Sequence, residues 1–266
     1  MKNEIIFLKL GGSLITDKDK PFTPRLDKLH DLAREIRDVF QVHPEMDLIL
    51  GHGSGSFGHT AAMKHGTREG VRTQEEWAGF SEVRYQAAEL NRHVMRVLFE
   101  SGIPAIPFPP SSMFVSRDRK VIHHGIMAMR KALEARLLPV VYGDVTFDEA
   151  RGGTILSTED VFTFLLQVFS PSRILLAGIE AGVWADFPAR THLIREIHSS
   201  NFLRTRARIS GSVSTDVTGG MKAKVEKMLG LIQDRPEISA QIFSAEPEGN
   251  LTRAVGGENV GTLLIS

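Results

Sequence analysis

Two apolar runs that stop abruptly at glycines constrain the fold of this chain more than any other feature. Residues 4–10 run into Gly11-Gly12-Ser13, and residues 46–51 run into Gly51-His52-Gly53-Ser54-Gly55. An apolar run without polar alternation predicts a buried strand. Glycines directly after such a strand let the backbone turn sharply and approach a ligand closely. A helix that begins there would favour a bound phosphate, so the pattern predicts two phosphate-bearing ligands side by side.

The order of the other elements predicts an α/β fold. Thr23-Pro24 is typical of a helix start, with a hydroxyl cap followed by proline, and a second long helix is predicted over residues 74–101. Hairpins are predicted within residues 113–122 and 145–156, and the polar, basic segment 201–214 is predicted to be a mobile loop. Strands alternate with helices throughout, which predicts a mostly parallel sheet covered on both faces.

Composition excludes several classes of protein. The 266 residues carry no net charge, so no basic excess indicates nucleic acid or an anionic membrane. The chain has no cysteine, which excludes disulfides, thiolate nucleophiles and cysteine-based zinc sites. No apolar run approaches the ~20 residues needed to span a bilayer, and the N-terminus shows no signal-peptide pattern. We therefore expect a cytoplasmic protein that does not bind a membrane.

Two alternative sites are disfavoured by position and spacing. Gly53-x-Gly55-x-x-Gly58 matches the dinucleotide-binding fingerprint, and Glu75 lies about 20 residues further on. The match follows the second predicted strand rather than the first, and the acidic residue opens a helix, which argues against NAD. His52, His59 and His65 are spaced too loosely for a typical metal site. His59 could instead donate a hydrogen bond to a bound phosphate, whereas His52 is predicted to have a structural partner.

Three lysines are candidates for a phosphoryl-transfer site. Catalysis of phosphoryl transfer consists mainly of positioning and electrostatic stabilisation, so it requires cations aimed at the transferring group. Lys9 lies inside an apolar strand, where an unpaired charge is unfavourable. For Lys18 and Lys224 a solvated surface position stays open as an alternative.

Two aspartates lie near predicted strand or helix ends. Asp160 stands three residues after Ser157, in the position of a capping box. It either caps its helix or orients the lysines by ion pairing. Asp144 follows a predicted strand directly.

Several motifs, taken together and in order, resemble a known family. They resemble the amino acid kinase superfamily in Lys9-Leu10-Gly11-Gly12-Ser13, Gly51-His52-Gly53-Ser54-Gly55, Ser157-Thr158-Glu159-Asp160 and Gly219-Gly220-Met221-x-x-Lys224. Within that superfamily the chain is similar to isopentenyl phosphate kinases in Lys18, Phe57-Gly58-His59 and residues 106–112. The fosfomycin-kinase branch is also similar and carries the same histidine. Two positions depart from the family pattern: Ser54 interrupts a glycine triplet, and Thr158 stands where a glycine is expected.

The resemblance implies a fold and a division of the chain. The fold would be a three-layer αβα sandwich with an open, mainly parallel sheet of about eight strands. Residues 1–266 would form a single amino-acid-kinase-type domain. Its N-terminal lobe, 1–170, would bind the phosphate acceptor, and its C-terminal lobe, 171–266, would bind ATP. A homodimer is expected from the same resemblance.

The resemblance also implies an activity: ATP-dependent phosphorylation of isopentenyl phosphate to isopentenyl diphosphate, with Mg²⁺. The apolar side of the helix that carries Trp77 and Val97 could line a pocket for the alkyl tail. Open alternatives are a kinase for fosfomycin or another small phosphonate, and a non-catalytic nucleotide-binding regulator, against which the three lysines argue. The implied roles are Lys9 and Lys18 at the transferring phosphoryl group; Gly53, Gly58 and His59 on isopentenyl phosphate; Gly11, Gly12, Ser13 and Ser54 near the ATP phosphates; Gly220 and Lys224 on the nucleotide; and Asp160 orienting the lysines.

Overall fold

One eight-stranded sheet forms the centre of the fold, in a computed structural model that describes residues 4–202, 220–233 and 235–266. Its strands are, in spatial order, β12 (Glu196–His198), β14 (Thr262–Ile265), β13 (Ser239–Ser244), β9 (Arg173–Gly178), β1 (Ile5–Leu10), β2 (Asp47–His52), β6 (Leu138–Tyr142) and β3 (Ala105–Pro107). Neighbouring strands run parallel, except that β13 and β14 are antiparallel. The predicted α/β fold with a mainly parallel sheet is confirmed.

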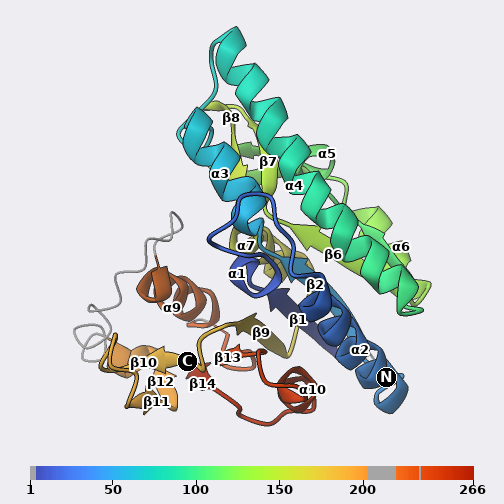
Figure 1. Cartoon of the computed structure of the whole chain (residues 1–266), viewed down its shortest axis with the longest axis vertical. Coiled ribbons are helices and arrows are strands. Elements are labelled where there is room, and N and C mark those ends of the chain that lie inside the picture. The colour runs from blue at the N-terminus through green and yellow to red at the C-terminus, as the bar shows by residue number, and fades with distance from the viewer. Residues whose placement is uncertain (1–3, 203–219, 234) are drawn as a thin grey trace.

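Helices cover both faces of this sheet (Figure 1). One face shares an apolar cluster with α1 (Gly12–Ile15), α2 (Leu26–Val42), α4 (Gln74–Glu100) and α10 (Asn250–Val255). The other face shares a cluster with α6 (Ile126–Glu134), α7 (Thr158–Val168) and α9 (Gly220–Ile232). Successive residues of β1 alternate between the two clusters, since Phe7 belongs to one and Leu8 to the other. This is the predicted three-layer arrangement.

A second, four-stranded sheet extends the molecule beyond the central one. It has the order β5 (Lys120–His124), β4 (Phe114–Arg117), β7 (Asp144–Asp148) and β8 (Gly152–Leu156). The pairs β4–β5 and β7–β8 are antiparallel, so both predicted hairpins are confirmed. The short helix α5 (Pro110–Met113) precedes this sheet, and α3 (Gly55–His65) packs against α4 beside it (Figure 1).

Two predicted boundaries differ from the structure. α2 begins at Leu26 rather than at Pro24, because Pro24 forms an antiparallel bridge with Thr16 that keeps this segment extended. The sequence also predicts one short strand over the apolar-rich residues 193–197, but the structure has two strands there in different sheets. β11 (Leu193–Ile194) pairs with β10 (Val183–Trp184), and β12 joins the edge of the central sheet. A 3₁₀ turn, Ser199–Asn201, follows β12. The predicted loop lies, from residue 203 onward, outside the described residues, as does Gly219.

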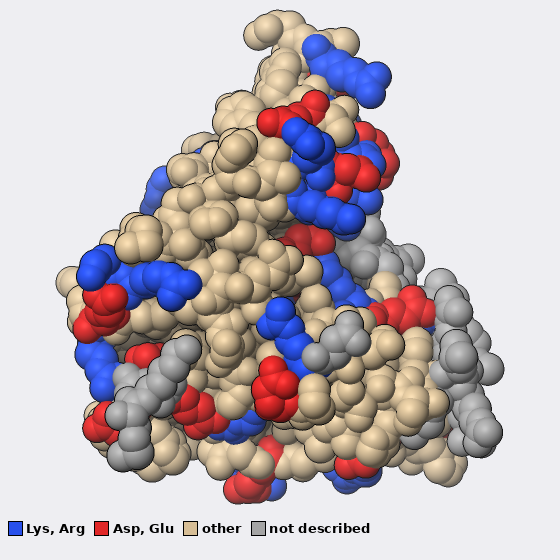
Figure 2. Space-filling view, turned by 180° about the vertical axis from the view of Figure 1, so that it is seen from behind, with Lys and Arg blue, Asp and Glu red and all other residues tan. Residues whose placement is uncertain are grey.

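The surface agrees with the charge balance of the sequence. On the face drawn in Figure 2, Lys and Arg side chains are interspersed with Asp and Glu side chains. Among the described residues, no helix combines the length and the apolar character needed to cross a membrane.

Candidate active site

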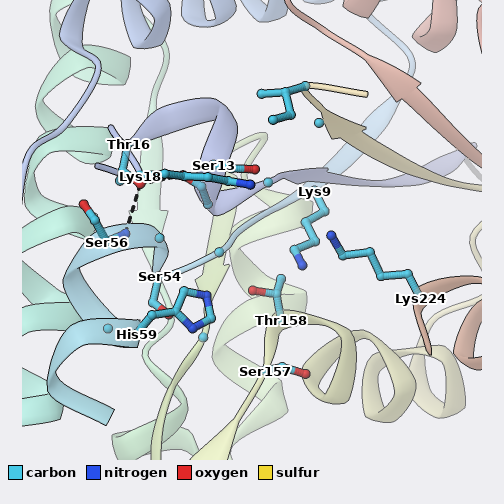
Figure 3. A pocket seen from close by; sticks show the side chains of 18 of the residues that line it. Lys9, Ser13, Thr16, Lys18, Ser54, Ser56, His59, Ser157, Thr158 and Lys224 are labelled. Atoms are coloured by element: carbon cyan, nitrogen blue, oxygen red, sulfur yellow. Dashed lines mark hydrogen bonds between the residues drawn. The ribbon is translucent and has the colours of Figure 1, made fainter. Parts of the chain in front are cut away.

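The two glycine turns lie against each other at one edge of the central sheet. β1 and β2 are parallel neighbours, so their carboxyl ends meet there. A Cβ placed on Gly12 would lie 2.5 Å from the Gly55 nitrogen, and a Cβ on Gly53 would lie 2.7 Å from the Gly12 nitrogen. The Thr16 hydroxyl ties the turns together, because it donates to the Gly12 carbonyl at 2.8 Å and accepts from the Ser56 N–H at 3.0 Å (Figure 3). The glycines are thus required for contact between the turns themselves, in addition to any ligand.

A cavity of about 700 Å³ opens over this edge. It is lined by most of the residues that the sequence singled out: Lys9, Gly11, Gly12, Ser13, Lys18, Gly53, Ser54, Gly58, His59 and Lys224. Residues from β9, β10 and α9 contribute one part of its wall, and residues from α3, α4 and β8 contribute another. In Figure 1 these two groups lie on opposite sides of α1, so the cavity extends across the glycine turns in both directions.

Lys9 is buried and paired with a carboxylate that the sequence analysis did not select. Only 9% of Lys9 is exposed, and its ammonium donates to Glu159 Oε1. Burial opposes ionisation of Glu159, but the charges of Lys9 and Lys224 outweigh it and hold the pKa of Glu159 at about 2. Figure 3 shows Lys9 and Lys224 reaching toward the same space from β1 and α9. Two cations and one carboxylate therefore share this part of the cavity.

Asp160 lies next to Glu159 but has other contacts. Its carboxylate completes the predicted capping box with Ser157 and pairs with Lys227 on α9. Burial raises the pKa of Asp160, but the contacts with Lys227 and Ser157 lower it further, so the net shift is downward. Asp160 thus pairs with a lysine of α9 that the sequence analysis did not consider, while Glu159 contacts Lys9.

A carboxylate partner for Lys9 could have been predicted from the sequence, because a buried ammonium without such a partner is unfavourable. Glu159 is that partner. Glu159 and Asp160 are consecutive helical residues and point in different directions, and the capping pattern drew attention to Asp160 alone.

Lys18 and His59 lie at the cavity with different exposure. Lys18 is exposed and extends past Ser13, whereas His59 is half-buried on α3 beside Ser54 (Figure 3). His52, in contrast, is fully buried, and its ring nitrogens contact the Gly53 carbonyl and Asn91 Oδ1, each at 3.1 Å. Burial lowers the pKa of His52. The prediction of a structural partner for His52 is confirmed.

The two residues that depart from the family pattern, Ser54 and Thr158, each pack against a glycine that leaves room for the side chain. A Cβ on Gly58 would lie 2.4 Å from the Ser54 Cβ, so Gly58 leaves the room that the Ser54 side chain fills. A Cβ on Gly51 would lie 2.6 Å from the Thr158 methyl group, so Gly51 does the same for Thr158. The Thr158 hydroxyl also donates to the His52 carbonyl at 2.6 Å. Each departure therefore packs without displacing the backbone of the turns.

Gly220 has a backbone role at the start of α9. Its φ of 67° lies in the left-handed region that favours glycine. It is not among the residues that line the cavity, which Met221 and Lys224 reach from the same helix.

Apolar side chains form the part of the cavity wall that lies on α3, α4 and β8. They are Ala62 and Met63 from α3, Val83 and Ala87 from α4, and Ile155 from β8, and Arg68, which follows α3, lines the cavity as well. Phe80 of the same helix packs instead against Gly153 of β8 and against Trp77. The long helix α4 therefore contributes to the cavity through Val83 and Ala87.

The chain is similar over nearly its whole length to proteins of one family. The model of the Amino acid kinase family matches residues 4–244. The isopentenyl phosphate kinase of Methanothermobacter thermautotrophicus is 32% identical over 96% of this chain and 97% of its own length. The enzyme of the same description from Methanocaldococcus jannaschii is 30% identical, over 97% of each chain. A solved structure of an isopentenyl phosphate kinase superposes with a TM-score of 0.81 at 28% identity, covering 98% of this chain and 100% of that one.

Proposed function

The chain belongs to the amino acid kinase family, and from that premise we propose that it phosphorylates isopentenyl phosphate to isopentenyl diphosphate, with ATP as the phosphoryl donor. The observation that carries this proposal is a single cavity that Lys9, Lys18 and Lys224, the half-buried His59 and several apolar side chains line together. Relatives described as isopentenyl phosphate kinases, similar over nearly the whole chain, support the same substrate.

The reaction we propose is a direct, in-line transfer. A phosphate oxygen of the acceptor forms a bond to the γ-phosphorus of ATP, the bond from that phosphorus to the β,γ-bridging oxygen breaks, and ADP leaves. The acceptor oxygen is anionic at neutral pH, so the step requires no strong general base. Catalysis then rests on positioning and on cations at the transferring group. We assign this role to Lys9 and Lys18, with Lys18 as the group whose interaction strengthens in the transition state.

The acceptor phosphate is proposed to lie at the start of α3. The dipole of this helix favours an anion there, although the Ser56 N–H already donates to Thr16 and the Phe57 N–H to the Ser54 carbonyl. Gly53 and Gly58 let the backbone approach the phosphate, and the His59 imidazole donates a hydrogen bond to one of its oxygens. The apolar wall of Ala62 and Val83 is suited to the alkyl tail.

The donor is proposed to lie on the other side of the turns. Gly11, Gly12, Ser13 and Ser54 would approach the ATP phosphates, and Lys224 would contact the nucleotide from α9, whose first residue is Gly220. This assignment gives acceptor binding to residues 1–170, while the ATP site combines the glycine turns of that lobe with Gly220 and Lys224 from residues 171–266. Residues of β9, β10 and α9 in the cavity wall support it.

Mg²⁺ is proposed to arrive with ATP. Among the described residues there is no group of three or more His, Asp or Glu side chains that could hold a metal ion. Mg²⁺ commonly binds through substrate phosphates and only one or two carboxylates, so the absence of such a group fits this route. The ion would neutralise charge on the β- and γ-phosphates. Glu159 is already engaged by Lys9, and we assign no step to the metal.

A panel of acceptors tests the proposed activity. ADP release should be measured with isopentenyl phosphate, dimethylallyl phosphate, fosfomycin, acetylglutamate and UMP under identical conditions. We expect the highest kcat/KM with isopentenyl phosphate. A clear preference for fosfomycin would replace the proposed substrate, and the absence of ADP release with every acceptor would favour a nucleotide-binding regulator. We also propose that the protein is a cytoplasmic homodimer. Light scattering coupled to gel filtration measures its mass in solution and so tests whether it is a dimer.

A further inference from the structure

The apolar part of the cavity wall lies in a helical hairpin whose arms meet at their far end. α3 leads away from the glycine turn and α4 returns against it (Figure 1). On α3, Gly58 and Ala62 line the cavity at a spacing that places them on one side of the helix. On α4, Val83 and Ala87 do the same. His65 is the last residue of α3. The proposed phosphate position at His59 and the hairpin turn at His65 are therefore separated by about 9 Å along α3.

At that far end the two helices are in close contact through a glycine. Gly79 is buried and lies one helical turn before Val83, on the same side of α4. A Cβ on Gly79 would lie 2.6 Å from His65 Cγ, 2.7 Å from its Nδ1 and 2.8 Å from its Cβ. The His65 ring is held from the other side, because its Nε2 lies 2.7 Å from Glu82 Oε2, a carboxylate that Lys64 also contacts.

We propose that the contact between Gly79 and His65 sets the width of the cleft between α3 and α4, and thereby the length of alkyl tail that the acceptor site admits. This inference rests on the proposed function and deepens it. Neither residue lines the cavity, so the two act through the helices that carry the lining residues Ala62 and Val83. The absence of a side chain at Gly79 keeps the far end closed, which suits a five-carbon tail and disfavours a ten-carbon one.

Adding one methyl group at Gly79 should open this end. Rotation of the imidazole does not relieve the contact, because the Cβ of His65 is itself within 2.8 Å of the new atom. The helices must instead separate by several tenths of an ångström next to Val83 and Ala62. For Gly79→Ala we expect the ratio of kcat/KM for geranyl phosphate to that for isopentenyl phosphate to rise by about fourfold or more, the factor that corresponds to one additional buried methylene.

A double variant that exchanges the glycine between the two positions provides the decisive comparison. His65→Gly combined with Gly79→Ala removes the opposing Cβ, so the ratio of kcat/KM for geranyl phosphate to that for isopentenyl phosphate should return to within about twofold of wild type. A twofold change is smaller than the about fourfold effect of one buried methylene. Gly230→Ala is the matched control, because Gly230 is an exposed helical glycine whose added Cβ would meet nothing within 4 Å. His65→Trp pushes the helices apart from the α3 side and should raise the ratio even if Gly79→Ala does not fold.

Each outcome has a distinct meaning. If the wild-type enzyme does not phosphorylate isopentenyl phosphate, the proposed function fails and the tail preference has no basis. If it does, and the folded Gly79→Ala and His65→Trp variants keep the wild-type ratio, the helix contact does not set tail length. A raised ratio that persists in the exchanged double variant would also overturn the inference, because the shift would then be independent of the contact.

Discussion

Replacing Glu159 by glutamine should destabilise the protein strongly while preserving the size of the side chain. Glu159 is 8% exposed and accepts from the buried ammonium of Lys9. Glutamine keeps an acceptor oxygen but removes the charge, so the ammonium loses the carboxylate that stabilises it. Removing one partner of a buried ion pair typically costs about 3–5 kcal/mol. For a chain of this size each kcal/mol lowers the melting temperature by about 2–4 °C, so we expect a decrease of roughly 6–20 °C.

The dependence on pH follows from the same pair. The pKa of Glu159 is lowered from 4.5 to about 2 in the folded protein. The stabilisation from its ionised form is therefore fully present above pH 4.5 and is lost as the pH falls toward 2. Acid unfolding of the wild type should include this loss, and Glu159→Gln should lack it.

Thermal unfolding of Glu159→Gln, Lys9→Met, their double variant and a control at pH 7.5 measures the effect. Lys9→Met together with Glu159→Gln removes both charges and should be more stable than Glu159→Gln alone, because no buried cation remains without its carboxylate. Glu258→Gln, in the exposed pair with Arg253, is the matched control and should change stability by at most about 1 kcal/mol. The reasoning is refuted if Glu159→Gln melts like the Glu258 control, or if the double variant loses the sum of the two single losses.

Four further outcomes are expected. Lys18→Ala should lower kcat by about 10²–10³ with little change in KM, and a near-normal kcat would remove Lys18 from the mechanism. His59→Ala should lower kcat/KM for isopentenyl phosphate about ten- to a hundredfold with ATP affinity preserved in calorimetry, whereas His59→Gln should retain part of the activity. Val83→Ala should raise relative kcat/KM for geranyl phosphate several-fold; an unchanged ratio would place the tail elsewhere. Since burial lowers the pKa of His52 below the usual 6.5, the stability that its neutral form contributes is present above pH 6.5 and decreases as the pH falls below it, so urea titrations at pH 7.5 and 5.5 should show a larger loss of unfolding free energy for wild type than for His52→Gln.

Local patterns predicted the elements that position the site. The apolar runs before Gly11 and Gly51 are the strands β1 and β2, and the glycines after them form the touching turns. These features are encoded within a few neighbouring residues, so periodicity and glycine placement suffice to find them. The capping box of Ser157 and Asp160 was found for the same reason.

Contacts between distant residues were beyond that reasoning. Lys9 and Glu159 are 150 residues apart, and no local signal distinguishes Glu159 from Asp160 as the partner. The start of α2 was misplaced because the bridge between Thr16 and Pro24 depends on how the first turn folds. Which residues of α4 face the cavity also depends on packing, since Phe80 lies against Gly153 of β8.

Rapid-quench labelling with γ-³²P ATP tests direct in-line transfer most directly. The enzyme is mixed with labelled ATP and isopentenyl phosphate, quenched on the millisecond scale, and separated into protein and small molecules without acid treatment. We expect the label to pass from ATP to isopentenyl diphosphate with no labelled protein at any time. Acid-labile phosphate on His59, forming and decaying as fast as product appears, would contradict direct transfer and the role of His59 as a hydrogen-bond donor.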